Sequence, residues 1–372
     1  MKLIAKIYKT SYLGKNGVFI LISLFVLIVL GAVFIPSFSE DIGDKQLFTL
    51  NGENLKYNDD KQVSQFLNSI KKNKGYLCLG TSESSLLNTG NYYDFLNNDT
   101  SVNNKFSVLY GAGRTCGIHI PMLLNNKNIV DSLKLIYFIN PVYWREDLCR
   151  VQKVYWDRYT NYTMCNKVAL TETEHKKYFE EVQAYFNQLN FIEKSTQFTE
   201  YWLRRIRKSY FQDLKYILNP TSYESNLAFV SDKQLNLSAF ESFGKINKEI
   251  DTIWNIHRDF KNKNWFNPIN EGIDYRYKEL ISFITLCKDL NVQATYLIGP
   301  INERFITNFD AKSLDAYKRT VQKIKDVLVQ QNTSYIDASD ISALPGTFID
   351  HQHHSSYGAY LIYEKIKSYI NE

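Results

Sequence analysis

The sequence predicts an α/β fold in which a parallel sheet is covered on both faces by helices. Short apolar runs alternate with stretches of helical periodicity, and the 372-residue chain is long enough to bury a large core. A single long apolar run also stands near the N-terminus, ahead of the alternating part. Charged residues make up only 22% of the chain and the net charge is +5, so the composition does not indicate a nucleic-acid partner.

The N-terminal apolar run covers residues 18–35 and contains no charged residue. A helix of this length extends about 27 Å, which is close to the hydrocarbon thickness of a bilayer. Lysines precede the run and acidic residues follow it, so the positive-inside rule predicts a cytoplasmic N-terminus and an extracellular remainder. The alternative is a cleavable signal peptide, but residues 33–37 lack a small-x-small cleavage site. We expect a cytoplasmic segment at 1–17, a retained transmembrane signal anchor at 18–36, and a linker with a small extended segment at 37–60.

The rest of the chain, residues 61–372, is expected to form one extracellular domain. Periodicity predicts short buried strands at residues 76–79, 106–110, 133–139, 294–298 and 334–336. It predicts helices at residues 62–72, 118–126, 275–290, 313–331 and 357–370. Residues 145–273 break this alternation, and their long helical patterns predict a helical insertion between the third and fourth strands.

Polar and glycine residues follow three of the predicted strands. Gly80-Thr81-Ser82 follows the first, a loop containing Gly113 follows the second, and Asn140 ends the third. The carboxyl ends of parallel strands meet at one edge of a sheet, so these groups are expected to lie together. Ser82 is a candidate nucleophile, and its backbone N–H, Gly113 and the Asn140 amide are candidate donors to an oxyanion. An ordinary helix cap at Ser82 and an Asx turn at Asn140 remain open as alternatives.

A histidine-rich loop near the C-terminus supplies the candidate base. Asp350 stands three residues before His353, so its carboxylate can hold one imidazole nitrogen while the other accepts a proton. His351 and His354 flank His353 and allow an alternative zinc site, although their spacing is not that of known zinc motifs. Only His353 has the aspartate at this distance, and we therefore prefer it as the base and predict no metal or other cofactor.

Five cysteines in an exported protein raise the question of disulfides. Cys78 and Cys287 stand in apolar contexts that predict buried thiols. Cys149 and Cys165 lie in a polar segment and form the candidate bridge, whereas the sequence does not decide the state of Cys116.

Taken together, these motifs resemble the SGNH hydrolase family and, within it, the DltD family, which acts in D-alanylation of lipoteichoic acid. The matching features are the N-terminal anchor, Gly80-Thr81-Ser82-Glu83, the segment from Ile139 to Trp144, Gly299-Pro300-Ile301-Asn302, and the spacing of Asp350, His353 and Gly358. Thr81 and Asn140 stand where the DltD pattern has serines, and Asn140 restores the asparagine usual in other SGNH enzymes.

The resemblance implies a flavodoxin-like α/β fold and a catalytic triad of Ser82, His353 and Asp350. It implies an anchored, extracytoplasmic acyltransferase or esterase that passes a D-alanyl group to a cell-envelope polymer such as lipoteichoic acid. The implied partner is a multi-spanning membrane-bound O-acyltransferase of the DltB type. Transfer and hydrolysis are both compatible with such a site. The alternatives are an O-acetyltransferase or esterase for an exported polysaccharide, a non-catalytic polymer-binding assembly subunit, and a metal-dependent hydrolase.

Overall fold

A computed structural model gives the fold of this chain. It describes residues 14–34, 47–48, 54–55, 60–84, 91–110, 115–145, 275–307, 311–348 and 351–372, with residues 173, 177–179, 190–192, 203, 206, 210, 214, 218 and 266 between them. Most of the predicted insertion at 145–273 lies outside the described residues, as do Cys149 and Cys165.

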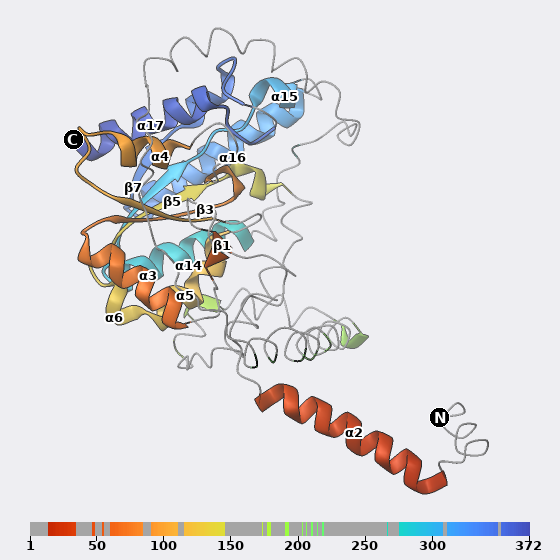
Figure 1. Cartoon of the computed structure of the whole chain (residues 1–372). Coiled ribbons are helices and arrows are strands. Elements are labelled where there is room, and N and C mark those ends of the chain that lie inside the picture. Colours follow the sequence, from red (N-terminus) through yellow and green to blue (C-terminus); the bar gives the residue numbers. More distant parts are fainter. Residues whose placement is uncertain are drawn as a thin grey trace.

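A seven-stranded sheet in the order β2-β1-β4-β3-β5-β6-β7 forms the centre of the molecule (Figure 1). Its strands are β1 (Leu47–Phe48), β2 (Asn54–Leu55), β3 (Tyr76–Gly80), β4 (Phe106–Tyr110), β5 (Lys134–Ile139), β6 (Gln293–Ile298) and β7 (Ser334–Asp337). The five strands from β3 to β7 pair in parallel, while β1 runs antiparallel to β2 and β4 at one edge. The parallel strands follow the 2-1-3-4-5 order of flavodoxin-like sheets. All five predicted strands are confirmed to within one residue, and the small extended segment expected in the linker is the edge pair β1 and β2.

Helices connect and cover these strands. They are α2 (Gly14–Phe34), α3 (Asp60–Lys72), α4 (Tyr92–Asn98), α5 (Ile120–Asn125), α6 (Lys127–Val130), α14 (Tyr275–Asp289), α15 (Glu303–Thr307), α16 (Ala311–Gln330) and α17 (Ser356–Asn371). Short 3-10 turns are η1 (Ser82–Ser84), η2 (Cys116–His119), η3 (Pro141–Trp144) and η9 (Ser339–Ala343). The helix predicted at 118–126 is divided into η2 and α5, because Pro121 lacks a backbone N–H and suits the first turn of a new helix.

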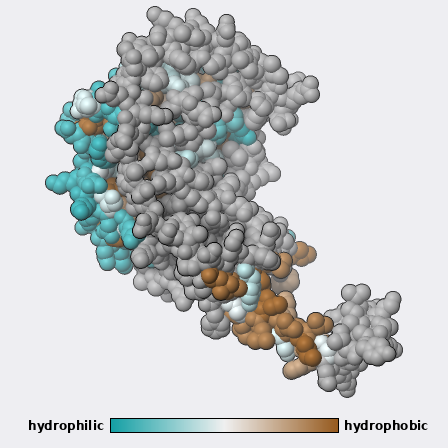
Figure 2. Space-filling view, in the orientation of Figure 1, coloured by the Kyte–Doolittle hydropathy of each residue, from teal (hydrophilic) through white to brown (hydrophobic). Residues whose placement is uncertain are grey.

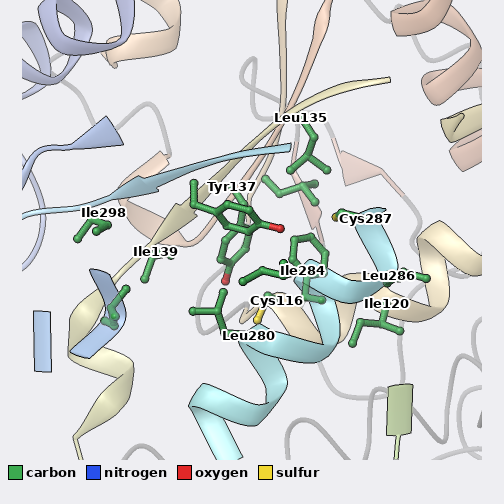
Figure 3. Close-up of a cluster of buried hydrophobic side chains, with 14 of the residues drawn as sticks. Cys116, Ile120, Leu135, Tyr137, Ile139, Leu280, Ile284, Leu286, Cys287 and Ile298 are labelled. Atoms are coloured by element: carbon green, nitrogen blue, oxygen red, sulfur yellow. The ribbon is translucent and has the colours of Figure 1, made fainter. Parts of the chain in front are cut away.

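The strand residues alternate between two cores, one on each face of the sheet. In β3, Leu77 and Leu79 pack in a cluster with α3, α14 and α16, whereas Cys78 packs in a cluster with α4 and α17. Figure 1 shows α4 and α17 on one side of the sheet and α3 and α14 on the other. Tyr137 of β5 lies in the first cluster, among Cys116, Leu280 and Ile284 (Figure 3). The predicted covering of the sheet on both faces is thereby confirmed.

Helix α2 stands apart from the layered part of the molecule (Figure 1). Its described side chains are strongly apolar and exposed, for example Phe19 at 72% and Leu27 at 65%, and they form the brown arm of Figure 2. A search of the described part of the chain finds no helix with both the length and the apolar character needed to cross a membrane.

Candidate active site

Ser82 lies at the carboxyl end of β3, two residues after the strand ends at Gly80. A side chain at Gly80 is excluded, because its Cβ would lie 2.1 Å from the hydroxyl oxygen of Ser84. That close approach lets Ser84 turn inward, where its hydroxyl shares a 2.7 Å hydrogen bond with Tyr92 of α4. Ser84 is therefore part of the core, whereas Ser82 is only half-buried at the edge of the sheet.

The loop that carries His353 is held between η9 and α17. Ser355 caps α17 by accepting a 3.1 Å hydrogen bond from the Gly358 N–H, and its own N–H donates to the Thr347 carbonyl at 2.9 Å. The Ser355 hydroxyl donates to the Gly346 carbonyl at 2.5 Å. A Cβ at Gly358 would lie 2.0 Å from the Thr347 carbonyl oxygen, so the loop packs directly on the backbone of the helix. These contacts fix the position from which His353 projects.

The structure brings His353 and Ser82 together although 271 positions separate them in the chain. The distance from His353 Nε2 to Ser82 Oγ is 2.9 Å, which is hydrogen-bond distance. In the tautomer that carries its hydrogen on Nδ1, Nε2 accepts the hydrogen of the serine hydroxyl. A serine with a base at this distance has the geometry required for nucleophilic attack with general-base assistance.

The two neighbouring histidines point elsewhere. The ring of His351 lies 5.7 Å from that of Phe305, and the His351 carbonyl accepts a 3.1 Å hydrogen bond from the Asn302 N–H. His354 is buried among three aromatic rings, those of Tyr92, Phe138 and Phe348, with centroids 5.5–6.3 Å away. Among the residues that the structure describes, no three histidine, cysteine, aspartate or glutamate side chains gather in a metal-binding group.

Asn140 directly follows β5, the strand beside β3, and its side chain is buried. Its Oδ1 accepts a 2.9 Å hydrogen bond from the Val142 N–H, which is the Asx turn considered as an alternative from the sequence. Its Nδ2 donates to Oε1 of Glu83, the buried residue directly after Ser82. The turn and a role beside the nucleophile are therefore compatible at this position.

The remaining predicted site residues, Asp350 and Gly113, lie outside the described residues, and their catalytic roles stay predictions. The chain just after the Gly113 loop is held by a buried cluster on α14. Glu279 Oε1 accepts hydrogen bonds from the Thr115 hydroxyl at 2.7 Å and the Gly117 N–H at 2.8 Å. Arg276 pairs with the other carboxylate oxygen of Glu279 at 2.8 Å. No sequence motif marks this cluster, because its two parts, at residues 115–117 and 276–279, lie more than 150 positions apart.

No curated protein matches the chain. Among solved structures, an extracellular lipase from Streptomyces rimosus aligns with a TM-score of 0.31 and 11% identity, over 79% of this chain and 98% of the lipase. Residues 247–371, which include β6, β7 and the His353 loop, match the family model described as DltD protein, so the resemblance of this chain to the DltD family is confirmed over its C-terminal third.

Proposed function

We propose that this protein is an extracytoplasmic serine acyltransferase or esterase of the cell envelope, held at the membrane by residues 18–36. The observation that carries the proposal is the 2.9 Å distance from Ser82 Oγ to His353 Nε2 at the carboxyl edge of a parallel sheet. In this mechanism Ser82 attacks an acyl carbonyl, and His353 takes the hydroxyl proton and later returns it to the leaving group. Asp350 holds the imidazole, and Gly113, Asn140 and the Ser82 N–H stabilise the oxyanion.

The acyl group is proposed to be D-alanyl and the acceptor a hydroxyl of a polymer such as lipoteichoic acid. The match of residues 247–371 to the DltD family supports this choice. Attack by the polymer hydroxyl on the acyl-enzyme gives transfer, and attack by water gives hydrolysis. The acyl group would be supplied by a multi-spanning membrane acyltransferase of the DltB type. The uncharged run at residues 18–35 and the exposed apolar side chains of α2 support the membrane attachment.

Ser82 offers a direct test because a second serine lies two residues away. Full-length protein in detergent micelles is assayed for hydrolysis of a nitrophenyl ester and for covalent labelling by a fluorophosphonate. The Ser82→Ala and His353→Ala variants should lose activity by about 10³-fold or more. The Ser84→Ala variant should retain it, because Ser84 faces Tyr92 in the core. Wild-type turnover in Ser82→Ala would remove Ser82 from the mechanism and favour the non-catalytic alternative.

The acyl group can be identified on the enzyme itself. Protein taken from cells is digested, and the mass of any adduct on the peptide that contains Ser82 is measured. A D-alanyl adduct supports the proposed substrate, whereas an acetyl adduct assigns the protein to polysaccharide acetylation.

Activity that disappears on exhaustive chelation and returns with a divalent metal would instead support the metal-dependent alternative.

A further inference from the structure

Glu83 is a buried carboxylate beside the proposed nucleophile, and the proton transfers of the mechanism do not use it. Its side chain is 4% exposed and follows Ser82 directly in η1. Burying a carboxylate costs free energy unless hydrogen bonds compensate for the lost hydration. The hydrogen bond from Asn140 Nδ2 supplies part of that compensation, and it connects the ends of β3 and β5.

The hydrogen bonds at Asn140 determine which way its amide faces. A backbone N–H can only donate, so the atom that meets Val142 N at 2.9 Å must be the amide oxygen. A carboxylate can only accept, so the atom that meets Glu83 Oε1 must be the amide nitrogen. Rotating the amide by half a turn would place oxygen against oxygen and nitrogen against nitrogen. The hydrogen bonds with Val142 and Glu83 therefore favour the same orientation of the Asn140 amide.

The pairing of β3 with β5 brings the Asn140 amide and Ser82 to the same edge of the sheet. In the parallel pairing of β3 with β5, Leu79 lies opposite Tyr137. Ser82 and Asn140 each stand three residues beyond this pair, Ser82 in η1 and Asn140 at the start of η3. Neighbouring strands lie about 4.8 Å apart, so a side chain at the end of one strand can reach a group at the end of the other. The amide has two hydrogens, and Glu83 accepts only one of them.

We infer that Glu83 is a positioning residue that holds the Asn140 amide with its nitrogen toward Ser82, ready to donate to the oxyanion formed at the acyl carbonyl. The inference rests on the proposed function, since it assigns Glu83 a role in the same reaction. It also explains why a carboxylate suits this position. A carboxylate oxygen accepts the amide N–H and cannot donate to the amide oxygen, so it favours this orientation of Asn140.

A double-mutant cycle tests whether Glu83 acts through Asn140. Ester hydrolysis is measured for full-length wild type, Glu83→Leu, Asn140→Ala and the double variant. Losing an oxyanion donor typically lowers kcat by about 10²–10³-fold, and we expect this for Asn140→Ala. Glu83→Leu should lower kcat about 10- to 100-fold with little change in KM. The double variant should be no slower than Asn140→Ala alone, because the amide that Glu83 positions is then absent.

Two further variants separate positioning from packing. Glu83→Gln keeps an acceptor oxygen for Asn140 Nδ2, and its kcat should stay within about fivefold of wild type. Tyr92→Phe removes a buried hydrogen bond to Ser84 in the same turn, without touching Asn140. Its effect on kcat should multiply with that of Asn140→Ala, as expected for independent sites.

The outcomes distinguish the inference from the proposed function. If a fluorophosphonate labels Ser82 but the Glu83→Leu and Asn140→Ala effects multiply, Glu83 acts by another route and the inference is wrong. An increase in KM at unchanged kcat in Glu83→Leu would lead to the same conclusion. If the fluorophosphonate does not label Ser82 in the wild-type protein, the proposed function itself is contradicted. Should Glu83→Leu not fold, a kcat for Glu83→Gln that falls as far as that of Asn140→Ala overturns the inference.

Discussion

Gly358 is the residue whose replacement should most directly separate the His353 loop from helix α17. An alanine Cβ at this position would lie 2.0 Å from the Thr347 carbonyl oxygen and 3.0 Å from its carbon. Carbon and oxygen atoms that are not bonded normally stay about 3.3 Å or more apart, so loop and helix must separate by roughly 1 Å. The same carbonyl accepts the Ser355 N–H at 2.9 Å, and this hydrogen bond lengthens with it.

The free energy of unfolding should fall by a few kcal/mol in Gly358→Ala. Forced overpacking typically costs about 1–3 kcal/mol, and a lost hydrogen bond adds about 1 kcal/mol. Alanine has a higher helix propensity than glycine, which offsets about 1 kcal/mol of this loss in the free energy of unfolding. The net loss of about 1–3 kcal/mol should lower Tm by several degrees. If His353 is the base, as proposed, activity should fall more steeply, because a 1 Å misplacement of a catalytic group can cost about 10²-fold.

Thermal unfolding followed by circular dichroism and steady-state ester hydrolysis measure the two effects. Ser368→Ala is the matched control, since Ser368 is exposed near the far end of the same helix. It should change stability by less than about 0.5 kcal/mol and leave kcat unaltered. Wild-type Tm and wild-type kcat in Gly358→Ala would refute the argument that backbone contact at this glycine positions His353.

Three further predictions concern groups away from the reacting atoms. Glu279→Ala leaves the buried Arg276 guanidinium without its carboxylate. The free energy of unfolding, measured by chemical denaturation, should therefore fall by about 3–5 kcal/mol. A fall of less than about 1 kcal/mol would contradict the importance of the buried pair. Burial opposes ionisation of Asp99, but hydrogen bonds from Lys367 and its neighbours outweigh it and hold the pKa of this carboxyl below its usual range. Asp99 therefore contributes stability above about pH 4 that is lost as the pH falls further, and Asp99→Asn should lower stability at neutral pH and flatten the acid limb of the stability profile. Burial raises the pKa of three thiols, and that of Cys287 reaches about 12. When native protein is treated with an alkylating reagent, peptide mass spectrometry should therefore find all three thiols unmodified. Alkylation of any of them without unfolding would contradict their burial. These thiols are Cys78, Cys116 and Cys287.

The parallel sheet could be predicted because its central strands, β3 and β5, are short runs of mainly apolar residues. These two strands are buried on both faces, and such runs are typical of parallel sheets. Helix α4 could not be predicted, since Tyr92–Asn98 is short and its start depends on the Asn91 side chain accepting the Tyr93 N–H at 2.8 Å. Its two tyrosines are fully buried against neighbours distant in the sequence, so tertiary packing rather than periodicity places this helix.

The pairing of Ser82 with His353 followed from chemistry read at separate points in the chain. The sequence supplied a serine after one strand and an Asp-x-x-His spacing before the last helix, and the topology explains why the two meet. The bond between Glu83 and Asn140 could not be found in this way. It depends on the register between β3 and β5 and on the inward turn of η1, and neither leaves a pattern in the sequence.

The three histidines of the C-terminal loop have different surroundings and different proposed roles. His354 lies between aromatic rings and packs the loop against the sheet, and His351 lies against Phe305 while its carbonyl accepts the Asn302 N–H beyond β6. Both flanking residues are thus committed to holding the loop, and they leave His353 at the distance from Ser82 that proton transfer requires. A loop fixed on either side of the proposed base loses less entropy when the reacting atoms come together, which is the advantage of a preorganised site. Substitution of His351 or His354 should therefore lower the free energy of unfolding, whereas substitution of His353, the proposed base, should lower kcat alone.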